Sequence, residues 1–238
     1  MHKIGFQKGL YDGIPIAVGY LSVSFGFGIT AVNLGIKILS AVLISMTNLT
    51  SAGQVAGLSV IVAAGTLFEM ALTQFVINVR YSLMGIALTQ RLSERFSTPH
   101  RLLASFFITD EIFAVAVTQK ERVTPSYMYG LSTLPYIGWV LGTVLGAVAG
   151  NLLPVSVASA LGIAIYGMFV AIVVPPAKEQ KGVLLAVILA VSVSLILYYV
   201  PLFKVISPGF AIIISGVIAA LFAALFAPVS KGGEGAHE

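Results

Sequence analysis

The sequence predicts an all-α polytopic membrane protein, and its composition and the spacing of its charges support that fold class. Of its 238 residues, 58% are hydrophobic and only 9% are charged, with a mean hydropathy of +1.01. A soluble domain carries about 25% charged residues, so a water-soluble globular fold is excluded. A membrane-spanning helix needs roughly 20 apolar residues. Runs of that length or more contain no Asp, Glu, Lys or Arg: 13–36, 38–68, 123–177, 182–203 and 205–230.

Charged residues and prolines divide the chain into apolar segments. Such long runs differ from the roughly 10-residue alternation of membrane β-barrels, so each segment is expected to be helical. The segments cover 13–35, 38–64, 66–90, 102–119, 125–150, 153–176, 182–202 and 206–228. We expect a single integral membrane transport domain over 1–238, with short tails at 1–12 and 229–238. The first segment lacks a cleavage site and is too long for a signal peptide, which predicts a retained span.

Two of these segments are expected to be broken or re-entrant rather than full spans. If every segment crosses the bilayer from a cytoplasmic N-terminus, Arg91, Arg95 and Arg101 face outside, against the preference of basic residues for the cytoplasm. If 38–64 and 102–119 instead dip in and return, these arginines lie inside. The sequence therefore predicts about 6–8 transmembrane helices, with one or two broken or re-entrant segments that line a central cavity.

Four charged residues inside apolar segments are the main candidates for function. A charge at mid-bilayer costs from about 2.5 to over 10 kcal/mol, so it usually faces a helix-bundle interior or a wet cavity. Glu69 and Arg80 share one face of a helix but stand roughly 16 Å apart along it, so each needs another partner. Glu69 also suits a helix N-terminus, and Arg80 also suits an interface that its long side chain can reach.

Asp110 and Glu111 are adjacent carboxylates in the fourth segment. Two close carboxylates suit proton coupling, because each makes ionisation of the other less favourable. They also suit binding of a cation or an ammonium group. The alternative is a structural acid that balances Arg80.

A polar stretch at 47–54 interrupts the second segment. Thr and Ser can bond their own helix carbonyls, but the amides of Asn48 and Gln54 are not expected to be satisfied so locally. Gly53 allows close approach of the backbone. A broken helix here would direct backbone N–H groups at a substrate carboxylate.

Glycine repeats predict close helix packing. Gly138, Gly142, Gly146 and Gly150 recur every fourth residue, a spacing that permits tight helix–helix contact in lipid. Packing within the chain is expected, and contact with a partner subunit is the alternative. The stretch 26–35 resembles 142–150, which suggests either an internal repeat or a chance likeness of two glycine-rich spans.

The sequence contains no recognisable enzyme or cofactor motif. It has no cysteine, and its histidines lie at 2, 100 and 237, outside the apolar segments. No phosphate-binding loop GxxxxGK[ST] is present. We therefore expect a protein that is not an enzyme and has no cofactor or metal. We also expect it not to bind nucleic acid, because its basic residues serve as topology determinants.

Several motifs together resemble the AzlC-type, azaleucine-resistance permease family, over about residues 5–228. Their order and spacing are more specific than any one alone. They are Gly13-Ile14-Pro15, Phe25-Gly26, Thr50-Ser51-Ala52-Gly53-Gln54, Asn78-Val79-Arg80-Tyr81, Thr109-Asp110-Glu111, Gly138-Trp139 and Tyr166-Gly167-Met168-Phe169 before Pro175-Pro176.

The resemblance implies a plasma-membrane exporter of valine, leucine or isoleucine that works with a small hydrophobic AzlD-type subunit. We then expect alternating access, coupled to protons, with binding and coupling residues among the polar and charged residues singled out above. The expected substrate-binding residues are Asn48, Gly53, Gln54, Asn78 and Arg80, and the expected proton-coupling residues are Asp110, Glu111 and Glu69. The alternative is an ion channel or a noncatalytic membrane assembly subunit.

Overall fold

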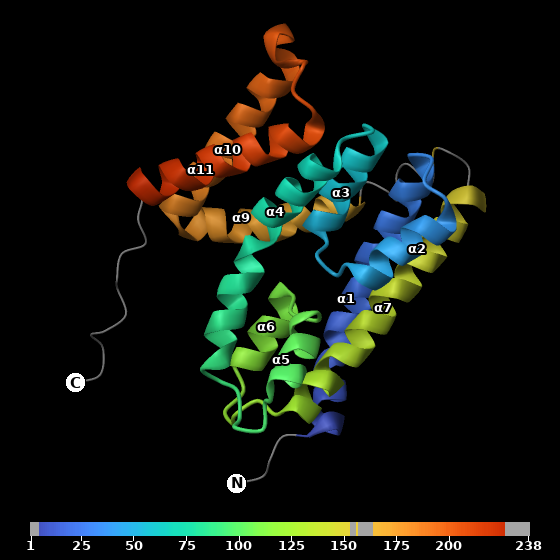
Figure 1. The fold of residues 1–238 in the computed structure, drawn as a ribbon, viewed down its shortest axis with the longest axis vertical. Helices are drawn as coiled ribbons and strands as arrows, with labels where there is room; N and C mark the ends of the chain where they lie inside the picture. The colour runs from blue at the N-terminus through green and yellow to red at the C-terminus, as the bar shows by residue number, and fades with distance from the viewer. Residues whose placement is uncertain (1–4, 153–155, 157–163, 227–238) are drawn as a thin grey trace. The chain divides into compact units, whose positions relative to one another are not determined.

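A computed structural model describes residues 5–152, 156 and 164–226, and in this part of the chain the regular structure is helical (Figure 1). This confirms the all-α polytopic fold class. The elements are α1 (Phe6–Asn33), α2 (Ile38–Thr47), α3 (Ala52–Val62), α4 (Leu67–Thr89), α5 (Thr98–Ser105), α6 (Asp110–Val117), α7 (Pro125–Leu152), α9 (Ala164–Glu179), α10 (Lys181–Tyr199), the 3₁₀ turn η1 (Pro201–Phe203) and α11 (Pro208–Phe226).

Within the described residues, five helices are long and apolar enough to cross a membrane: α1, α4, α7, α10 and α11. The two segments that the sequence predicts to be broken form two short helices each, α2 with α3 and α5 with α6. The breaks predicted in these two segments are therefore confirmed, whereas their re-entrant path in the membrane and the central cavity that they line stay predictions.

The helices group into two compact units, each described here by itself. The first consists of Met1–Leu58 and Asn78–Tyr166, and the second of Ser59–Ile77 and Gly167–Glu238. Helices α3, α4 and α9 each run from one unit into the other. The single transport domain expected over 1–238 stays a prediction.

The first unit is built on a parallel pair of helices, α1 and α7, which lie side by side along most of their lengths (Figure 1). Glycines of α7 meet the α1 backbone directly: an added Cβ at Gly138, Gly142 or Gly146 would overlap the carbonyl oxygen of Ala17, Leu21 or Phe25. Such close approach lets two helices pack in lipid without bulky side chains between them. Packing within the chain, the expected role of this glycine repeat, is confirmed.

The segment that carries α5 and α6 begins and ends at the same place in the first unit. Leu92, after α4, pairs with Val123, just before α7. Arg91 donates to the carbonyl oxygen of Gln119, and Arg122 donates to that of Leu92. Eight residues extend a helix only about 12 Å, so α5 and α6 form a short hairpin that returns to its point of entry.

The break between α2 and α3 spans 48–51 and is closed by local hydrogen bonds. The Asn48 side-chain oxygen accepts from the backbone N–H and the hydroxyl of Thr50, at 3.1 and 2.5 Å. Ser51 adopts the left-handed conformation, with φ 49°. A non-glycine residue in that conformation is uncommon, and here it lies at the turn where one helix stops and the next begins.

Some boundaries differ from those expected. The tail predicted at 1–12 is shorter, because α1 begins at Phe6, where the Lys8–Asp12 ion pair of 2.7 Å stabilises its first turns. His100, expected outside the fourth segment, lies within α5, and Pro175-Pro176, expected at the end of the sixth segment, lie inside α9. Residues 153–155 and 157–163 of that segment lie outside the described residues.

Candidate functional site

Two of the predicted charged residues meet in the first unit. The Arg80 guanidinium, on α4, pairs with the Asp110 carboxylate, the first residue of α6, at 2.7 Å. Arg80 also donates to the Tyr81 hydroxyl at 3.1 Å. The two charged side chains are 44% and 45% exposed. The partner that Arg80 was expected to need is therefore Asp110. The ion pair is partly exposed rather than buried within the unit.

Local sequence explains why α6 begins at this ion pair. Thr109 is the N-cap residue, and its side-chain oxygen accepts from the Ile112 N–H. Asp110 and Glu111 occupy the first turn, where the helix dipole favours negative charge. The Thr-Asp-Glu motif thus ends the break after α5, starts α6, and places two carboxylates together at that position.

The second carboxylate of this motif contacts a residue that the sequence analysis did not identify. The Tyr20 hydroxyl, on α1, lies 2.6 Å from Glu111 Oε2 and 2.5 Å from Thr109 Oγ1. Tyr20 is buried, with 7% exposure. A buried tyrosine hydroxyl usually finds a hydrogen-bond partner, which is the signal that could have marked Tyr20, but a sequence alone does not say which partner.

Gln54 lies in a second polar group of the first unit, centred on Trp139. Gln54 Oε1 accepts from the Trp139 indole N–H at 2.9 Å, and Gln54 Nε2 donates to Ser45 Oγ at 2.9 Å. Ser45 Oγ is in turn 2.7 Å from the Thr143 hydroxyl. Gln54 is only 1% exposed, so its amide is satisfied by distant residues, as the sequence analysis expected.

The two polar groups meet where the Tyr20 and Trp139 rings touch. The ring centroids are 5.1 Å apart, with an interplanar angle of 72°. This edge-to-face arrangement is a favourable geometry for aromatic pairs. The structure therefore brings Gln54, Glu111, Asp110 and Arg80 into one connected set of contacts in the first unit.

Two other predicted binding residues have local roles. The Asn48 side-chain oxygen, against expectation, is satisfied locally, because it accepts twice from Thr50. Asn and Asp side chains commonly form such turns with the backbone two residues ahead. The N–H of Gly53 donates to the Thr50 carbonyl at 3.2 Å, so it is occupied and does not point freely at a ligand.

Asn78 precedes Arg80 by two residues on α4. Two residues correspond to a rotation of about 200° around a helix, so Asn78 and Arg80 leave α4 in nearly opposite directions. Asn78 is half-buried and has interactions of its own.

Glu69 belongs to the second unit, where it caps a helix. Its carboxylate accepts from the Ser207 hydroxyl and, at 3.0 Å, from the Gly209 N–H, at the start of α11. Glu69 also occupies the first turn of its own helix, α4, where its N–H donates to Thr66 Oγ1 at 3.1 Å. Glu69 is 3% exposed, and these contacts match the helix-terminus role that the sequence allowed.

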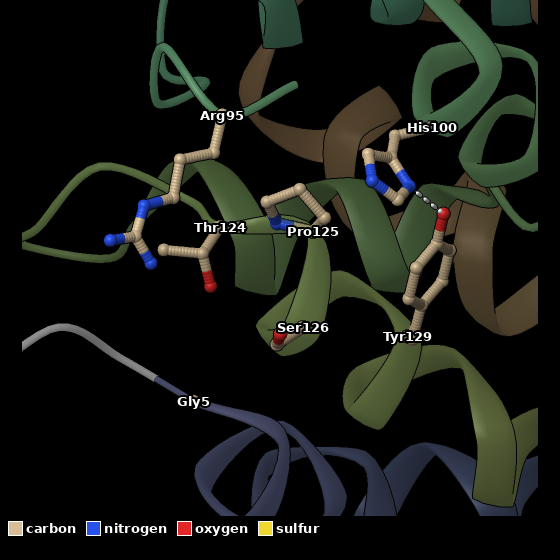
Figure 2. A pocket seen from close by; sticks show the side chains of 7 residues that line it. All are labelled: Gly5, Arg95, His100, Thr124, Pro125, Ser126 and Tyr129. Carbon is tan, nitrogen blue, oxygen red and sulfur yellow. Dashed lines mark hydrogen bonds between the residues drawn. The ribbon is translucent and has the colours of Figure 1, made fainter. Parts of the chain in front are cut away.

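A separate cavity of about 350 Å³ lies at the end of the first unit where α1 and α7 begin (Figure 2). Arg95 and His100 line it, with Gly5 and the first residues of α7. The His100 Nδ1 is hydrogen-bonded to the Tyr129 hydroxyl at 2.7 Å (Figure 2). None of the residues predicted to bind substrate lines this cavity.

The described residues contain no group of three or more His, Cys, Asp or Glu side chains that could hold a metal ion. Arg80, Asp110 and Glu111, here called the Arg80 group, place a guanidinium beside two carboxylates, and these are groups that can bind the two charges of a zwitterion. A guanidinium presents paired N–H donors that match a carboxylate, and the neighbouring carboxylates accept from an ammonium group.

Fold and site together define a polytopic α-helical membrane protein that brings charged and polar groups together in its first unit. A family model described as "AzlC protein" matches residues 15–153. The chain belongs to the AzlC family, which confirms the family resemblance seen in the sequence motifs.

Individual relatives are membrane proteins as well. The chain is 33% identical over 150 residues to the inner membrane protein YgaZ of Escherichia coli (strain K12), covering 61% of this chain and 61% of YgaZ. It is 32% identical over 186 residues to an uncharacterized membrane protein of Archaeoglobus fulgidus, covering 76% and 81%. A Helicobacter pylori membrane protein is 24% identical over 159 residues, covering 63% and 68%. No solved structure matches the chain.

Proposed function

We propose that this chain transports branched-chain amino acids out of the cell by alternating access, coupled to protons. In this proposal it is the large subunit of a two-component permease, with a small hydrophobic AzlD-type membrane subunit as its partner. Membership of the AzlC family supports the substrate class, and the chemistry of the Arg80 group supports an amino acid as ligand.

The observation that carries the proposal is the Arg80–Asp110 ion pair. Without substrate, each charge balances the other, which lowers the cost of placing them within a membrane domain. A zwitterionic amino acid carries the same two charges in complementary positions. Its carboxylate would replace Asp110 on the guanidinium, and its ammonium would take the place of Arg80 on the carboxylate.

In this proposal the neutral part of the substrate route comes from two polar stretches: Asn48, Gly53 and Gln54 at the α2–α3 break, and Asn78 on α4. Proton coupling is assigned to Asp110 and Glu111, which are adjacent at the start of α6. Glu69 is a third candidate, although its hydrogen bonds already cap α11. A cytoplasmic N-terminus is proposed from the basic residues near α1, α5 and α7.

The test is counterflow of labelled leucine in proteoliposomes, with and without a co-reconstituted small subunit. Loss of a charge-assisted hydrogen bond costs about 1.5–3 kcal/mol, and 1.4 kcal/mol is a factor of about 10 in rate. We therefore expect Arg80→Lys and Asp110→Asn each to lower counterflow about tenfold or more. Arg95→Lys, at a guanidinium outside the ion pair, is the matched control and should leave counterflow unchanged.

Two outcomes would contradict the proposal. Full counterflow by both variants, at normal membrane levels, would remove the Arg80–Asp110 pair from the substrate site. Absence of saturable counterflow by the wild-type protein in both preparations would favour a channel or an assembly subunit, because neither exchanges a bound amino acid.

A further inference from the structure

We propose that Tyr20 is a positioning residue that links the protonation state of Glu111 on α6 to Gln54 on α3, through the indole ring of Trp139. The inference rests on the proposed function, because it assigns the route by which proton binding and the α2–α3 break influence each other. Tyr20, Trp139, Gln54 and Glu111 all belong to the first unit.

The first link is the Tyr20 hydroxyl, whose single hydrogen has two oxygen atoms within hydrogen-bond distance. The Tyr20 hydroxyl oxygen lies 2.6 Å from Glu111 Oε2 and 2.5 Å from Thr109 Oγ1, but a tyrosine carries a single O–H. When Glu111 is ionised it can only accept, so Tyr20 donates to Glu111 and Thr109 donates to Tyr20. Every hydroxyl hydrogen in the group then has an acceptor.

Protonation of Glu111 changes this hydrogen-bond pattern, because the carboxyl group is then no longer an acceptor only. A neutral carboxyl group either accepts more weakly from Tyr20 or donates to it. If Glu111 donates, the Tyr20 hydrogen must turn to Thr109, and the Thr109 hydroxyl loses its acceptor. Because Thr109 is buried and is the N-cap of α6, the change acts at the break between α5 and α6.

The second link joins Tyr20 to the other broken segment. The Tyr20 and Trp139 rings meet edge to face at 5.1 Å, and the Trp139 N–H donates to Gln54 at 2.9 Å. Trp139 is 2% exposed, so the indole has little free space. A shift of the Tyr20 ring therefore changes the surroundings of Trp139 and the hydrogen bond that holds Gln54.

Other charged and titratable groups face Glu111 and belong to the same electrostatic group. They are Asp110 beside it on α6, Tyr81 on α4 and Tyr20 on α1, and Arg80 joins this group through its contacts with Asp110 and Tyr81. Of these, Tyr20 is the one that also contacts Trp139. A signal that passes from Glu111 to Trp139 through this contact should therefore depend on the Tyr20 hydroxyl.

The chain offers a direct reporter, because Trp139 is its single tryptophan. We would record the emission of Trp139 in the purified full-length protein, in lipid nanodiscs without substrate, as pH is lowered through the titration range of carboxyl groups. The wild-type spectrum should change with pH. Tyr20→Phe, which keeps the ring but removes the hydroxyl, and Glu111→Gln, which cannot titrate, should both lose that change.

Tyr129→Phe is the matched control. Its hydroxyl contacts His100 rather than Glu111 or Trp139, so its pH response should equal that of the wild type. A role of Tyr20 in packing alone would shift the spectrum equally at every pH and leave its pH dependence intact. That result, or a wild-type spectrum without pH dependence, would overturn the inference. If Tyr20→Phe does not fold, Glu111→Gln still decides whether Glu111 is the source of the Trp139 response, and a response that persists in Glu111→Gln overturns the inference.

Leucine counterflow of the same proteins separates this inference from the proposed function. We expect leucine counterflow by the wild type to vary with pH, and Tyr20→Phe to retain leucine binding but to lose that pH dependence. Loss of the Trp139 response with unchanged pH dependence of counterflow would show that the link does not serve transport, and would overturn the inference. A wild-type protein with the Trp139 response but no saturable counterflow would contradict the proposed function alone.

Discussion

At the scale of single residues, Glu69 combines a buried carboxylate with hydrogen bonds to the start of α11. If capping is its role, Glu69→Gln should keep leucine counterflow, because a Gln side-chain oxygen can still accept from Ser207 and Gly209. Glu69→Ala should lower stability by about 1–3 kcal/mol, since it leaves buried donors unpaired. Thermal unfolding in detergent measures the second effect, and counterflow the first.

The opposite pattern would assign Glu69 to proton coupling. A Glu69→Gln protein of normal stability that loses counterflow cannot be explained by a lost cap. Glu69 stands out in the sequence because charge in an apolar segment is costly. The choice between the two roles depends on Ser207 and Gly209, which lie far along the chain and which nothing local marks as partners.

Two uncharged residues, Tyr20 and Trp139, have contacts whose role the sequence did not predict. Tyr20 and Trp139 are apolar enough to suit any membrane helix, and neither stands in a polar stretch. Their roles depend on which side of α1 and α7 faces the broken segments, which only the packing determines. Asn48 shows the opposite limit: its polarity suggested an amide open to a ligand, but its side-chain oxygen accepts from Thr50 two residues away.

At the scale of elements, the glycine contacts between α1 and α7 lead to a clear prediction. At Gly146 an added Cβ would overlap the Phe25 carbonyl, which is backbone and cannot rotate away. Gly146→Ala should therefore push the helices apart and destabilise the protein by about 1–3 kcal/mol, as overpacking does. The measurement is thermal unfolding in detergent, monitored by the loss of the monodisperse peak in size-exclusion chromatography.

Gly19→Ala is the control within the same helix pair. Nothing lies within 4 Å of a Cβ added there, and Ala favours a helix over Gly by up to about 1 kcal/mol. We expect unchanged or slightly higher stability. Equal destabilisation by both changes would mean that the loss comes from the glycine backbone itself and not from the α1–α7 contact.

Helix and break positions were largely predictable, because charge placement and apolar length are local properties of the sequence. The four-residue glycine spacing also predicted a packing face, but not that α1 would be its partner. The Gly53 N–H illustrates the limit: a glycine after a break suggested an open backbone, yet the turn uses that N–H for the Thr50 carbonyl.

At the scale of the whole molecule, the first unit gathers basic residues at one end. Arg91 and Arg122 bind backbone carbonyls around the Leu92–Val123 pair, and Arg95 lines the cavity beside the start of α7. Lys37 follows the far end of α1, a helix of 28 residues that extends about 42 Å. This arrangement, with α5 and α6 as a hairpin, resolves the conflict that full spans would create for the positive-inside preference.

The topology can be tested by labelling, since the chain has no cysteine and single cysteines need no background removal. We expect Arg95→Cys and Lys120→Cys to react with a membrane-impermeant maleimide from the same side of sealed vesicles, and Lys37→Cys from the other. The hairpin requires the first result, because Leu92 pairs with Val123, and the length of α1 requires the second. With a cytoplasmic N-terminus, Arg95→Cys and Lys120→Cys react in inside-out vesicles. Reaction of Arg95→Cys and Lys120→Cys from opposite sides would mean that 102–119 crosses the bilayer, and the re-entrant arrangement of α5 and α6 would then be wrong.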